Sequence, residues 1–544
     1  MYGQPVYILK EGTERTRGKD AQRNNITAAR AVSEAIRSAL GPKGMDKMLI
    51  DNFGDTTVTN DGATILKEIE VSHPAAKFVI DLAKTQDQET GDGTTTVVVI
   101  AGELLKQAEE LLDLDIHPTS IVEGYKLSRF QADKILEEMA QDVSFEDDKI
   151  LRAVADTSMS SKIVSGEKGP LSKLVVKAVK SVAEEKDGEM FADIDNILIQ
   201  KKKGGSLDDT ELIDGIILDK EFVHTDMPKK IEDAKIVLLD KGLELSKTEI
   251  DAKINITSPD QIQAFLDNEH EMLKEMADKI IASGANVVLC QKGIDDIIQH
   301  YLAKQGISAA RRIKKSDMEK LAKATGAKIS TSLDDLDNYI GKAQVAEEKS
   351  IGDDNMIFIT GCDNPKAVSI IIRGGTEMIV DEADRAIHDA LCVVRQVIHD
   401  KQVVPGGGAP ELRISHKLGD FAMGQTSKVQ LAVEKFAKAM EIIPRTLAEN
   451  AGLDPIDVLS ELHVQHAEDG HGYGVNPFKA KVDNMTKLNV FEPISVKKQA
   501  ISSAAEAAEM ILRIDDVIAA KELSGGPGMP PGGPGGPGGM DEDY

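Results

Sequence analysis

The chain has 544 residues, a formal net charge of −27, and 41% hydrophobic but only 3% aromatic residues, with no tryptophan. The length predicts about three domains, and the aliphatic composition favours cores of closely packed helices. The acidic surface argues against nucleic acid as a partner. A charged N-terminus and the lack of a long apolar run argue against export and membrane insertion, so we expect a cytoplasmic protein.

The first part of the chain, from residue 20 to about 140, has the periodicity of helices. Apolar residues at helical spacing predict a helix over Asn25–Leu40, and the Gly41-Pro42-Lys43-Gly44 segment terminates it. Two short β-rich runs then predict a hairpin. The hairpin strands are expected at Met48–Ile50 and Thr56–Thr59, and further helices at Ala75–Thr85, Thr94–Leu112 and Pro118–Met139.

The central part, from about residue 190, has short β runs separated by helical stretches, which is typical of an α/β or α+β domain. A turn is expected at Asp363-Asn364-Pro365. From about residue 376 the pattern is helical again, so an α/β domain is nested inside a helical one. Strands are expected at Ile197–Ile199, Ile216–Leu218, Ile236–Leu239, Val287–Cys290, Met356–Thr360 and Val368–Ile372, and later helices at Leu412–Leu418, Val429–Ile442 and Ala500–Ala520.

The sharpest local motif is Gly91-Asp92-Gly93-Thr94-Thr95-Thr96 at the start of an apolar helix. Its glycines allow close approach of a ligand, free N–H groups at the helix start favour phosphate, and Asp92 is able to hold Mg²⁺. A simple helix cap after a glycine turn explains the motif equally well. Asn60-Asp61-Gly62 and Gly406-Gly407-Gly408 are two further loops that precede helices. The first is more simply explained as a turn. The second is more simply explained as a plain connection, although its loop-to-helix geometry also suits a nucleotide.

The helix expected at Thr376–His399 carries Asp381, Arg385 and Asp389 at intervals of four residues. A carboxylate beside an apolar face is able to act as a base towards water. The alternative is an ordinary ion pair between Arg385 and Asp389.

The histidines, the cysteines and one amphipathic helix each have an ordinary structural explanation. His463, His466 and His471 match no metal-site spacing and are expected to be solvated loop residues; the three separated cysteines form no Cys-x-x-Cys pair. A helix beginning at Ser258-Pro259 carries methionines on its apolar face, which favours either a promiscuous binding surface or an ordinary core-facing helix.

Taken together and in order, LGPKGMDKML, VTNDGATIL, HPAAK, GDGTTT and the triple-glycine loop resemble the chaperonins. Three later segments resemble the group II branch, which comprises the archaeal thermosomes and the eukaryotic cytosolic chaperonin. They are KTEIDAKINITSPDQIQAFLDNEHEMLKEM, ARRIKKSDMEKLAKATGA and EMILRIDDVIAA with the Gly/Met-rich tail that follows.

This resemblance implies a multidomain α+β fold, with a mostly helical equatorial domain, a nested intermediate domain, and an α/β apical domain that carries a helical protrusion as a built-in lid. The implied boundaries are 1–145 and 403–523 for the equatorial domain, 146–215 and 370–402 for the intermediate domain, 216–369 for the apical domain with its lid at about 243–282, and 524–544 for a disordered Gly/Pro-rich tail.

The resemblance also implies an ATPase that uses Mg²⁺. Asp389 would activate the attacking water with help from Asp61, Asp92 would bind Mg²⁺, and Lys162 would sense the terminal phosphate. Arg413 and Gln396 depart from the acidic residues expected there, outside the phosphate cradle. The implied ATP-binding residues are Leu40, Gly41, Pro42, Asp92, Gly93, Thr94, Thr95, Thr96, Lys162, Gly407, Gly474 and Glu492.

The function that the resemblance implies is ATP-driven folding of non-native client proteins in a stacked double ring of identical or closely related subunits. No separate lid co-chaperonin, nucleic acid or membrane is expected as a partner. The alternative is an ATP-binding assembly that holds clients without a productive cycle, for which Asp389 would be dispensable. A monomeric small-molecule kinase would share only the glycine loop.

Overall fold

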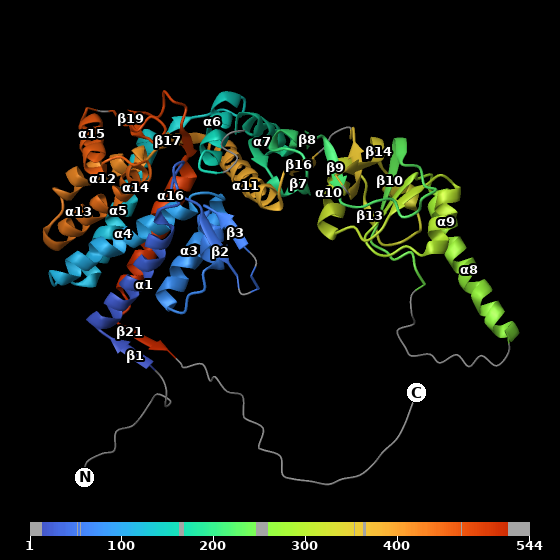
Figure 1. Cartoon of the computed structure of the whole chain (residues 1–544), viewed down its shortest axis with the longest axis horizontal. Helices are drawn as coiled ribbons and strands as arrows, with labels where there is room; N and C mark the ends of the chain where they lie inside the picture. The colour runs from blue at the N-terminus through green and yellow to red at the C-terminus, as the bar shows by residue number, and fades with distance from the viewer. Residues whose placement is uncertain are drawn as a thin grey trace, which may run out of the picture.

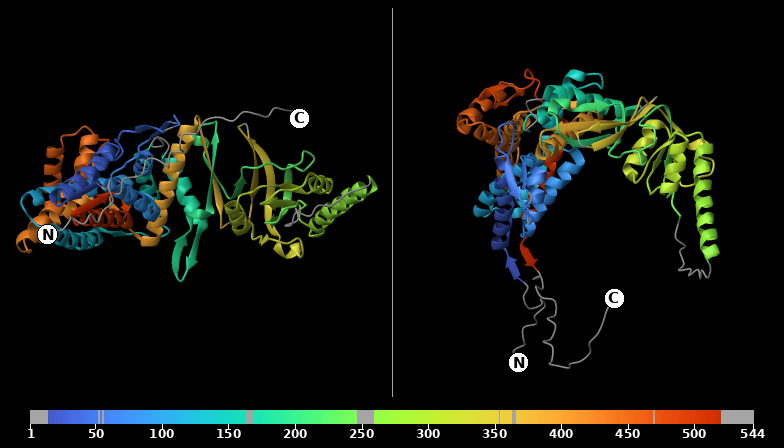
Figure 2. Two further views of the ribbon diagram at one scale, coloured as in Figure 1. Left: turned by 90° about the horizontal axis from the view of Figure 1, so that it is seen from below. Right: turned by 45° about the vertical axis from the view of Figure 1, so that its right-hand side comes forward.

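The computed structural model describes residues 14–519, apart from 52, 55, 163–167, 246–258, 353, 363–365 and 469. Its helices and strands form three bodies in an arch, each with its own hydrophobic core (Figure 1 and the right-hand view of Figure 2). We call them the helical body, the middle body and the sheet body. The turn expected at 363–365 and the tail at 524–544 lie outside the described residues.

The helical body is built from both ends of the chain. Its central helix α4 (Thr94–Asp113) is buried on all sides over Val97–Leu105, because that run contains almost no polar residue. Helices α1 (Lys19–Arg37) and α16 (Ile494–Leu512) pack against α4 from opposite ends of the sequence. The remaining helices are α2 (Gly62–Glu68), α3 (Pro74–Thr90), α5 (Pro118–Met139), α12 (Ala409–Ala422), α13 (Ser427–Met440), α14 (Ile442–Asn450) and α15 (Pro455–Ala467).

Small antiparallel strand pairs edge the helical body. The hairpin expected from the sequence is confirmed, while the helix expected at Ala500–Ala520 is wrong in its last turns. It ends at Leu512, and β21 (Asp516–Ala519) pairs with β1 (Glu14–Arg17) from the other end of the chain. The other strands here are β2 (Lys47–Ile50), β3 (Thr56–Thr59), β18 (Tyr473–Asn476) and β19 (Lys481–Asn484), with β4 (Gln141–Asp142), β17 (Gln402–Pro405) and β20 (Phe491–Pro493) towards the middle body.

An aromatic pair closes the core between α5 and α13. The rings of Tyr125 and Phe436 meet edge to face with their centroids 5.4 Å apart, and both side chains are fully buried. The Tyr125 hydroxyl donates a 2.7 Å hydrogen bond to the Leu104 carbonyl of α4. The pair therefore joins three helices at one point.

Replacing Phe436 with alanine should lower the free energy of unfolding by about 3–5 kcal/mol, since it removes a buried ring and leaves a cavity. Denaturant titration followed by circular dichroism measures the loss. Phe130 on α5 is 58% exposed, so Phe130→Ala is the matched control and should change stability by about 0.5 kcal/mol or less. Equal losses in the two variants would contradict this account of the core.

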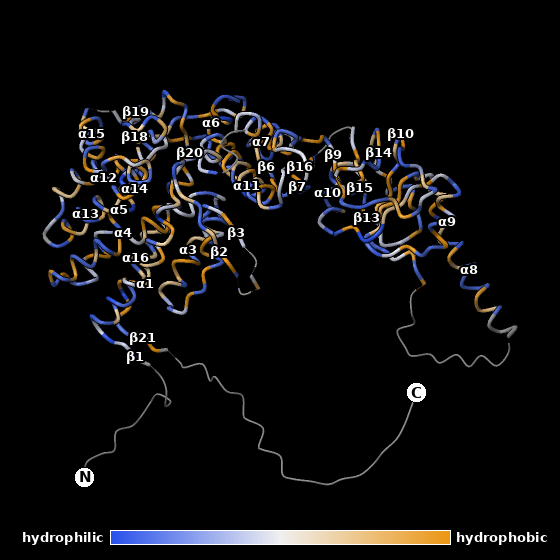
Figure 3. The backbone as a smooth tube through the Cα atoms, in the orientation of Figure 1, coloured by the Kyte–Doolittle hydropathy of each residue, from blue (hydrophilic) through white to orange (hydrophobic). Residues whose placement is uncertain are grey.

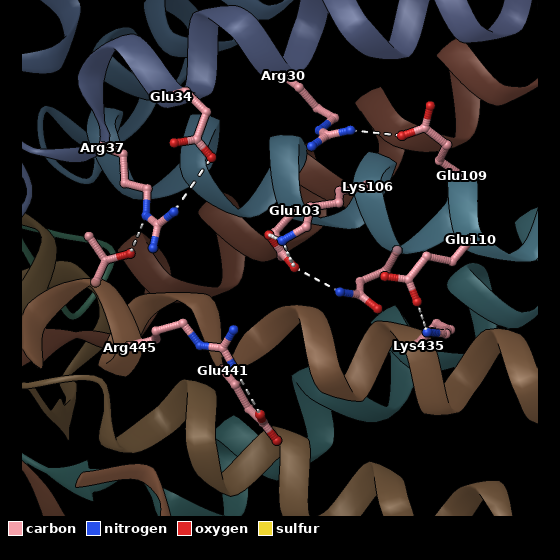
Figure 4. Close-up of polar contacts among 12 residues, drawn as sticks. Arg30, Glu34, Arg37, Glu103, Lys106, Glu109, Glu110, Lys435, Glu441 and Arg445 are labelled. Atoms are coloured by element: carbon pink, nitrogen blue, oxygen red, sulfur yellow. Dashed lines mark hydrogen bonds and ion pairs between the residues drawn. The ribbon is translucent and has the colours of Figure 1, made fainter. Parts of the chain in front are cut away.

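Acidic and basic side chains of α1, α4 and α13 form a series of polar contacts (Figure 4). Arg30 of α1 pairs with Glu109 of α4 at 2.7 Å, and Lys106 pairs with Glu103 at 3.1 Å along α4. Lys435 of α13 contacts Glu110 of α4. Glu103 is buried, but the Arg30–Glu109 and Lys435–Glu110 pairs are partly exposed and each contributes only about 0–1 kcal/mol, so the buried apolar contacts dominate the packing.

The middle body joins the other two. Its sheet is three-stranded, with β16 parallel to β7 and antiparallel to β8, and its longest helix, α11, begins at a Thr376 side-chain cap. Its elements are α6 (Asp148–Met159), α7 (Lys168–Val182), α11 (Glu377–Asp400), β5 (Ala183–Lys186), β6 (Glu189–Ala192), β7 (Ile197–Lys203), β8 (Glu211–Ile213) and β16 (Val368–Gly374).

The sheet body contains a mixed seven-stranded sheet. Six strands follow the order β12-β11-β10-β14-β15-β9, and the seventh, β13, also pairs with β10. Strands β11, β12 and β13 run parallel to their neighbours, as helix-connected strands do; β14, β15 and β9 pair antiparallel. The elements are β9 (Gly215–Leu218), β10 (Lys230–Leu239), β11 (Val287–Cys290), β12 (Ser308–Ala310), β13 (Ile329–Ser330), β14 (Gly341–Ile351), β15 (Asp354–Thr360), α8 (Pro259–Ala282), α9 (Asp296–Lys304) and α10 (Lys315–Thr325).

Helix α8 extends away from the sheet at the outer end of the arch, and its residues alternate between hydrophobic and hydrophilic (Figure 3). Leu273, Ala277 and Ile280 in its second half are buried against the sheet body. Phe265, Leu266 and Met272 are exposed. The core-facing interpretation is therefore confirmed for Leu273, Ala277 and Ile280, and the binding surface stays a prediction. Across the described residues, no helix has the length and apolarity needed to span a bilayer.

Candidate functional site

A cavity of about 430 Å³ opens where the helical body meets the middle body. The start of α4, the start of α12, the loop after α1 and the end of α6 converge on it. All the site residues expected from the sequence line this cavity, except Gly474. They are Leu40, Gly41, Pro42, Asp61, Asp92, Gly93, Thr94, Thr95, Thr96, Lys162, Asp389, Gly407 and Glu492.

Gly474 lies behind the cavity wall. A Cβ atom placed there would lie 2.7 Å from the carbonyl oxygen of Gly407 and 3.0 Å from that of Gly406. Gly474 therefore lets the triple-glycine loop pack closely against β18. Gly474 is absent from the cavity lining, and its expected contact with the nucleotide stays a prediction.

Backbone N–H groups at a helix start make the cavity suitable for an anionic group such as phosphate. Helix α4 begins after Gly93, which has φ of 81°, a left-handed conformation that glycine adopts without strain. No side chain caps the start of α4, and Thr94, Thr95 and Thr96 line the cavity. Helix α12 also begins after a left-handed glycine, Gly408, but Pro410 has no N–H and the Ala409 N–H donates to the Gly406 carbonyl at 3.3 Å. The start of α4 is therefore the helix terminus that favours an anionic group in this cavity.

Close packing of the loops also requires glycine at position 62. A Cβ atom there would lie 2.5 Å from the Thr95 hydroxyl and 2.9 Å from the Thr95 backbone nitrogen. The Asn60–Gly62 loop and the start of α4 therefore touch each other at this point. Any side chain at Gly62 would push the start of α4 out of place.

Asp61 and Asp92 are held by their own loops. Asp61 caps α2, accepting hydrogen bonds from the Thr64 N–H at 2.9 Å and the Thr64 hydroxyl at 2.7 Å. The Asp92 carboxylate accepts from the Gly93 N–H at 2.6 Å, and its carbonyl accepts from the buried Gln86 amide at 3.0 Å. Both carboxylates are thereby fixed in the cavity wall.

Asp389 reaches the cavity from α11, in the middle body, and contacts the Lys162 ammonium. Burial raises the pKa of Asp389 well above its usual range, and Lys162 opposes this shift. Burial lowers the pKa of Lys162, but the charges of Asp389, Asp61 and Asp92 outweigh it, so the pKa of the lysine is raised and it stays protonated. A carboxyl group whose pKa is raised by burial takes up a proton more readily than an ordinary aspartate, as a general base requires.

The ion pair considered between Arg385 and Asp389 is wrong. The Arg385 guanidinium instead bonds Glu382, at 2.7 Å and 3.0 Å, because residues three apart on a helix are also neighbours. This leaves Asp389 to face the cavity. It also explains why Arg385 is absent from the cavity lining.

The donor set fits a divalent cation bound together with phosphate. The cavity presents the carboxylates of Asp61, Asp92 and Asp389 with the ammonium of Lys162 between them. Anionic phosphate beside this excess of carboxylates requires a counter-cation, and Mg²⁺ is typically held by one or two carboxylates plus phosphate oxygens. Within the described part of the chain, no cluster of three or more His, Cys, Asp or Glu side chains forms a metal site on its own.

A buried ion cluster at the far end of the cavity was missed from the sequence. Lys497 of α16 bonds Glu492 at 2.7 Å and Glu411 at 2.9 Å. Burial raises the pKa of Glu492, and Lys497 opposes that shift. Lys497 and Glu411 lie 86 residues apart, so only tertiary packing brings them together, and no local signal marks them.

Of the three histidines expected in a solvated loop, His471 is an exposed residue outside the helix, as predicted, whereas His463 and His466 belong to α15. His466 is fully buried and bonds the Tyr473 carbonyl at 2.8 Å, and burial lowers its pKa to about 4. His463 bonds Glu441 at 3.3 Å. Arg413 and Gln396, which depart from the acidic residues of the family pattern, lie outside the cavity lining. Arg413 donates a hydrogen bond to the His466 carbonyl, and Gln396 donates one to the Glu89 carbonyl.

The sequence matches the TCP-1/cpn60 chaperonin family over residues 32–522. It is similar to thermosome subunit beta of Archaeoglobus fulgidus, with 58% identity over 525 residues and 96% of each chain covered. It is also similar to the thermosome subunits of Methanopyrus kandleri, at 57% over 523 residues with 96% of each chain covered, and of Pyrococcus horikoshii, at 57% over 524 residues with 96% of this chain and 95% of that one.

Proposed function

This chain belongs to the TCP-1/cpn60 chaperonin family, as a group II, archaeal-type ATP-dependent ring chaperonin, and from that premise we propose that it hydrolyses ATP with Mg²⁺ in the cavity described above. The observation that carries the proposal is the meeting of Asp389, from the middle body, with the loops of the helical body in one cavity. A site divided between two bodies is able to convert nucleotide chemistry into relative motion of those bodies.

In this proposal the loops bind the nucleotide. The N–H groups at the start of α4 and the loop at Leu40–Pro42 hold the phosphates. Glu492, fixed by Lys497, lies at the nucleoside end. Mg²⁺, when bound, would neutralise phosphate charge, and Asp92 would hold it.

Asp389 is the proposed general base. It takes a proton from a water molecule as that water's oxygen bonds to the terminal phosphorus, and the bond from that phosphorus to the bridging oxygen of ADP breaks. Asp61 assists in orienting the water. The Lys162 ammonium, which contacts Asp389, would detect the terminal phosphate.

We assign the helical body as the equatorial domain, the middle body as the intermediate domain and the sheet body as the apical domain, with the sequence boundaries given above. Helix α8 would form part of a built-in lid at about 243–282, of which 246–258 lie outside the described residues. Docking of α11 on the nucleotide would move the sheet body and close the lid, provided that the closed state binds ATP more tightly.

The proposed partners are non-native client proteins and identical or closely related subunits in a stacked double ring in the cytoplasm, without a separate lid protein. The exposed Phe265, Leu266 and Met272 of α8 support apolar contacts made by the lid. The alternative of a passive holding assembly leaves the buried Asp389–Lys162 pair without a role.

The first test is the native mass and the activity of the purified chain. We expect closed cyclic symmetry with about 16 copies of the chain, roughly 0.9 MDa in total. The particle should hydrolyse ATP only with Mg²⁺ and should raise the recovery of a denatured client enzyme only while ATP is hydrolysed. Full client recovery with a non-hydrolysable ATP analogue would favour the holding assembly and overturn the proposed cycle.

A further inference from the structure

Helix α11 carries three polar side chains at intervals of seven residues: Glu382, Asp389 and Gln396. Seven residues are close to two helical turns, so the three side chains lie along one face of the helix. Asp389, the middle member, enters the cavity. The outer two lie two turns before and two turns after it.

Glu382 contacts the helical body through Thr59. The Thr59 hydroxyl donates a 3.1 Å hydrogen bond to Glu382 Oε2, and both residues are buried, at 0% and 1% exposure. Arg385 donates two further bonds to the same oxygen and offsets the carboxylate charge. This contact joins β3 of the helical body to α11 of the middle body.

The same hydroxyl also holds Asp61. The Asp61 N–H donates to Thr59 Oγ1 at 3.1 Å, so this hydroxyl accepts one bond and donates another, as its chemistry allows. The carboxylate on α11 and the backbone of Asp61 are thus linked through one oxygen atom. A shift of α11 relative to β3 would act directly on Asp61.

Gln396 makes the matching contact at the other end. Its side-chain amide donates a 2.8 Å hydrogen bond to the Glu89 carbonyl. Glu89 is in the last turn of α3, which is followed directly by Gly91, Asp92 and Gly93. The outer contacts of α11 therefore reach the two segments that carry Asp61 and Asp92.

We propose that Thr59, Glu382 and Gln396 are positioning residues, which fix the register and rotation of α11 on the helical body so that Asp389 meets the water that attacks ATP. This inference rests on the proposed hydrolysis at Asp389. Two contacts, one on each side of Asp389, prevent α11 from sliding or turning. A displacement of about 1 Å at a reacting group is enough to cost about 100-fold in rate.

Steady-state ATP hydrolysis and equilibrium ATP binding by the assembled particle test the proposal. Thr59→Val keeps the shape of the side chain and removes the hydroxyl, so we expect kcat to fall by about 10-fold or more while ATP affinity stays within about 2-fold. Thr59→Ser keeps the hydroxyl and should restore kcat to within about 2-fold of the parent. Gln396→Ala, at a half-buried position where folding is less at risk, should lower kcat by about 3-fold or more with the same unchanged affinity.

Asp381→Asn is the matched control, since Asp381 lies on α11 but pairs with Lys201 within the middle body; its kcat should equal that of the parent. The effects of Thr59→Val and Glu382→Leu on kcat should be non-additive, because each removes one partner of the same contact. The fold-losses of kcat in Thr59→Val and Gln396→Ala should instead multiply in the double variant.

Two outcomes would overturn the inference. One is a parental kcat in both Thr59→Val and Gln396→Ala. The other is a loss of ATP affinity in these variants that is as large as their loss of kcat. Asp389→Ala, measured alongside, distinguishes failure of the positioning inference from failure of the proposed function. If Asp389→Ala hydrolyses ATP at the parental rate, the proposed catalytic role of Asp389 is itself wrong.

Discussion

Replacing Asp389 with alanine is expected to lower the rate of ATP hydrolysis by about 10²–10⁴-fold, the range typical of a lost general base. ATP binding should persist, because the loops that line the rest of the cavity belong mainly to the helical body. Client proteins should still bind but should not be released in folded form. Single-turnover hydrolysis, together with nucleotide binding by calorimetry, separates the chemical step from binding.

The control for this variant is Asp384→Ala, which removes a carboxylate from the same helix that pairs with Lys201 at 3.2 Å. It should hydrolyse ATP at the parental rate. The parental pH profile gives a second readout: burial raises the pKa of Asp389, and a base works only when ionised. Hydrolysis should therefore decline with falling pH at values above those of an ordinary aspartate, and a flat profile down to pH 4 would argue against Asp389 as the base.

Replacing Asp92 with asparagine is expected to lower Mg²⁺-dependent ATP hydrolysis by about 100-fold. Loss of a residue that only supports a metal ligand typically costs about 10–100-fold, and Asp92 is the proposed ligand itself. Asparagine keeps the shape of the side chain and an oxygen that is able to accept the Gly93 N–H bond, so the loop should remain in place. The charge that would attract the cation is lost.

Titration of hydrolysis against Mg²⁺ concentration measures this effect, which should appear first as a higher Mg²⁺ requirement. Asp81→Asn is the control, since Asp81 is an exposed residue of α3 that pairs with Lys84. Partial rescue of Asp92→Asn at high Mg²⁺ would support direct ligation. A parental Mg²⁺ requirement would rule out Asp92 as the ligand.

The features predicted correctly from sequence are those set by local chemistry. The hairpin of β2 and β3 follows from short β-rich runs around a turn, and the start of α4 follows from glycine before an apolar run. The cavity residues were identified because their motifs resemble those of a known family, and their meeting in one cavity agrees with that resemblance.

The features that were missed depend on contacts between distant parts of the chain. β21 is a strand because β1 pairs with it from about 500 positions away, while its own sequence continues a helical pattern. The Lys497 cluster and the burial of His466 depend on how α12, α15 and α16 pack. The role of Gly474 depends on a carbonyl in another loop.

The construction of the helical body from both ends of the chain has a consequence for synthesis on the ribosome. Helix α4 is covered by α16, which leaves the ribosome roughly 380 residues after it, about 20–80 s later at 5–20 residues per second. The sheet body, by contrast, is continuous in sequence and is able to fold first. During that interval the part of the α4 surface that α16 covers stays exposed, which makes the nascent chain prone to aggregation until the C-terminal helix has been synthesised.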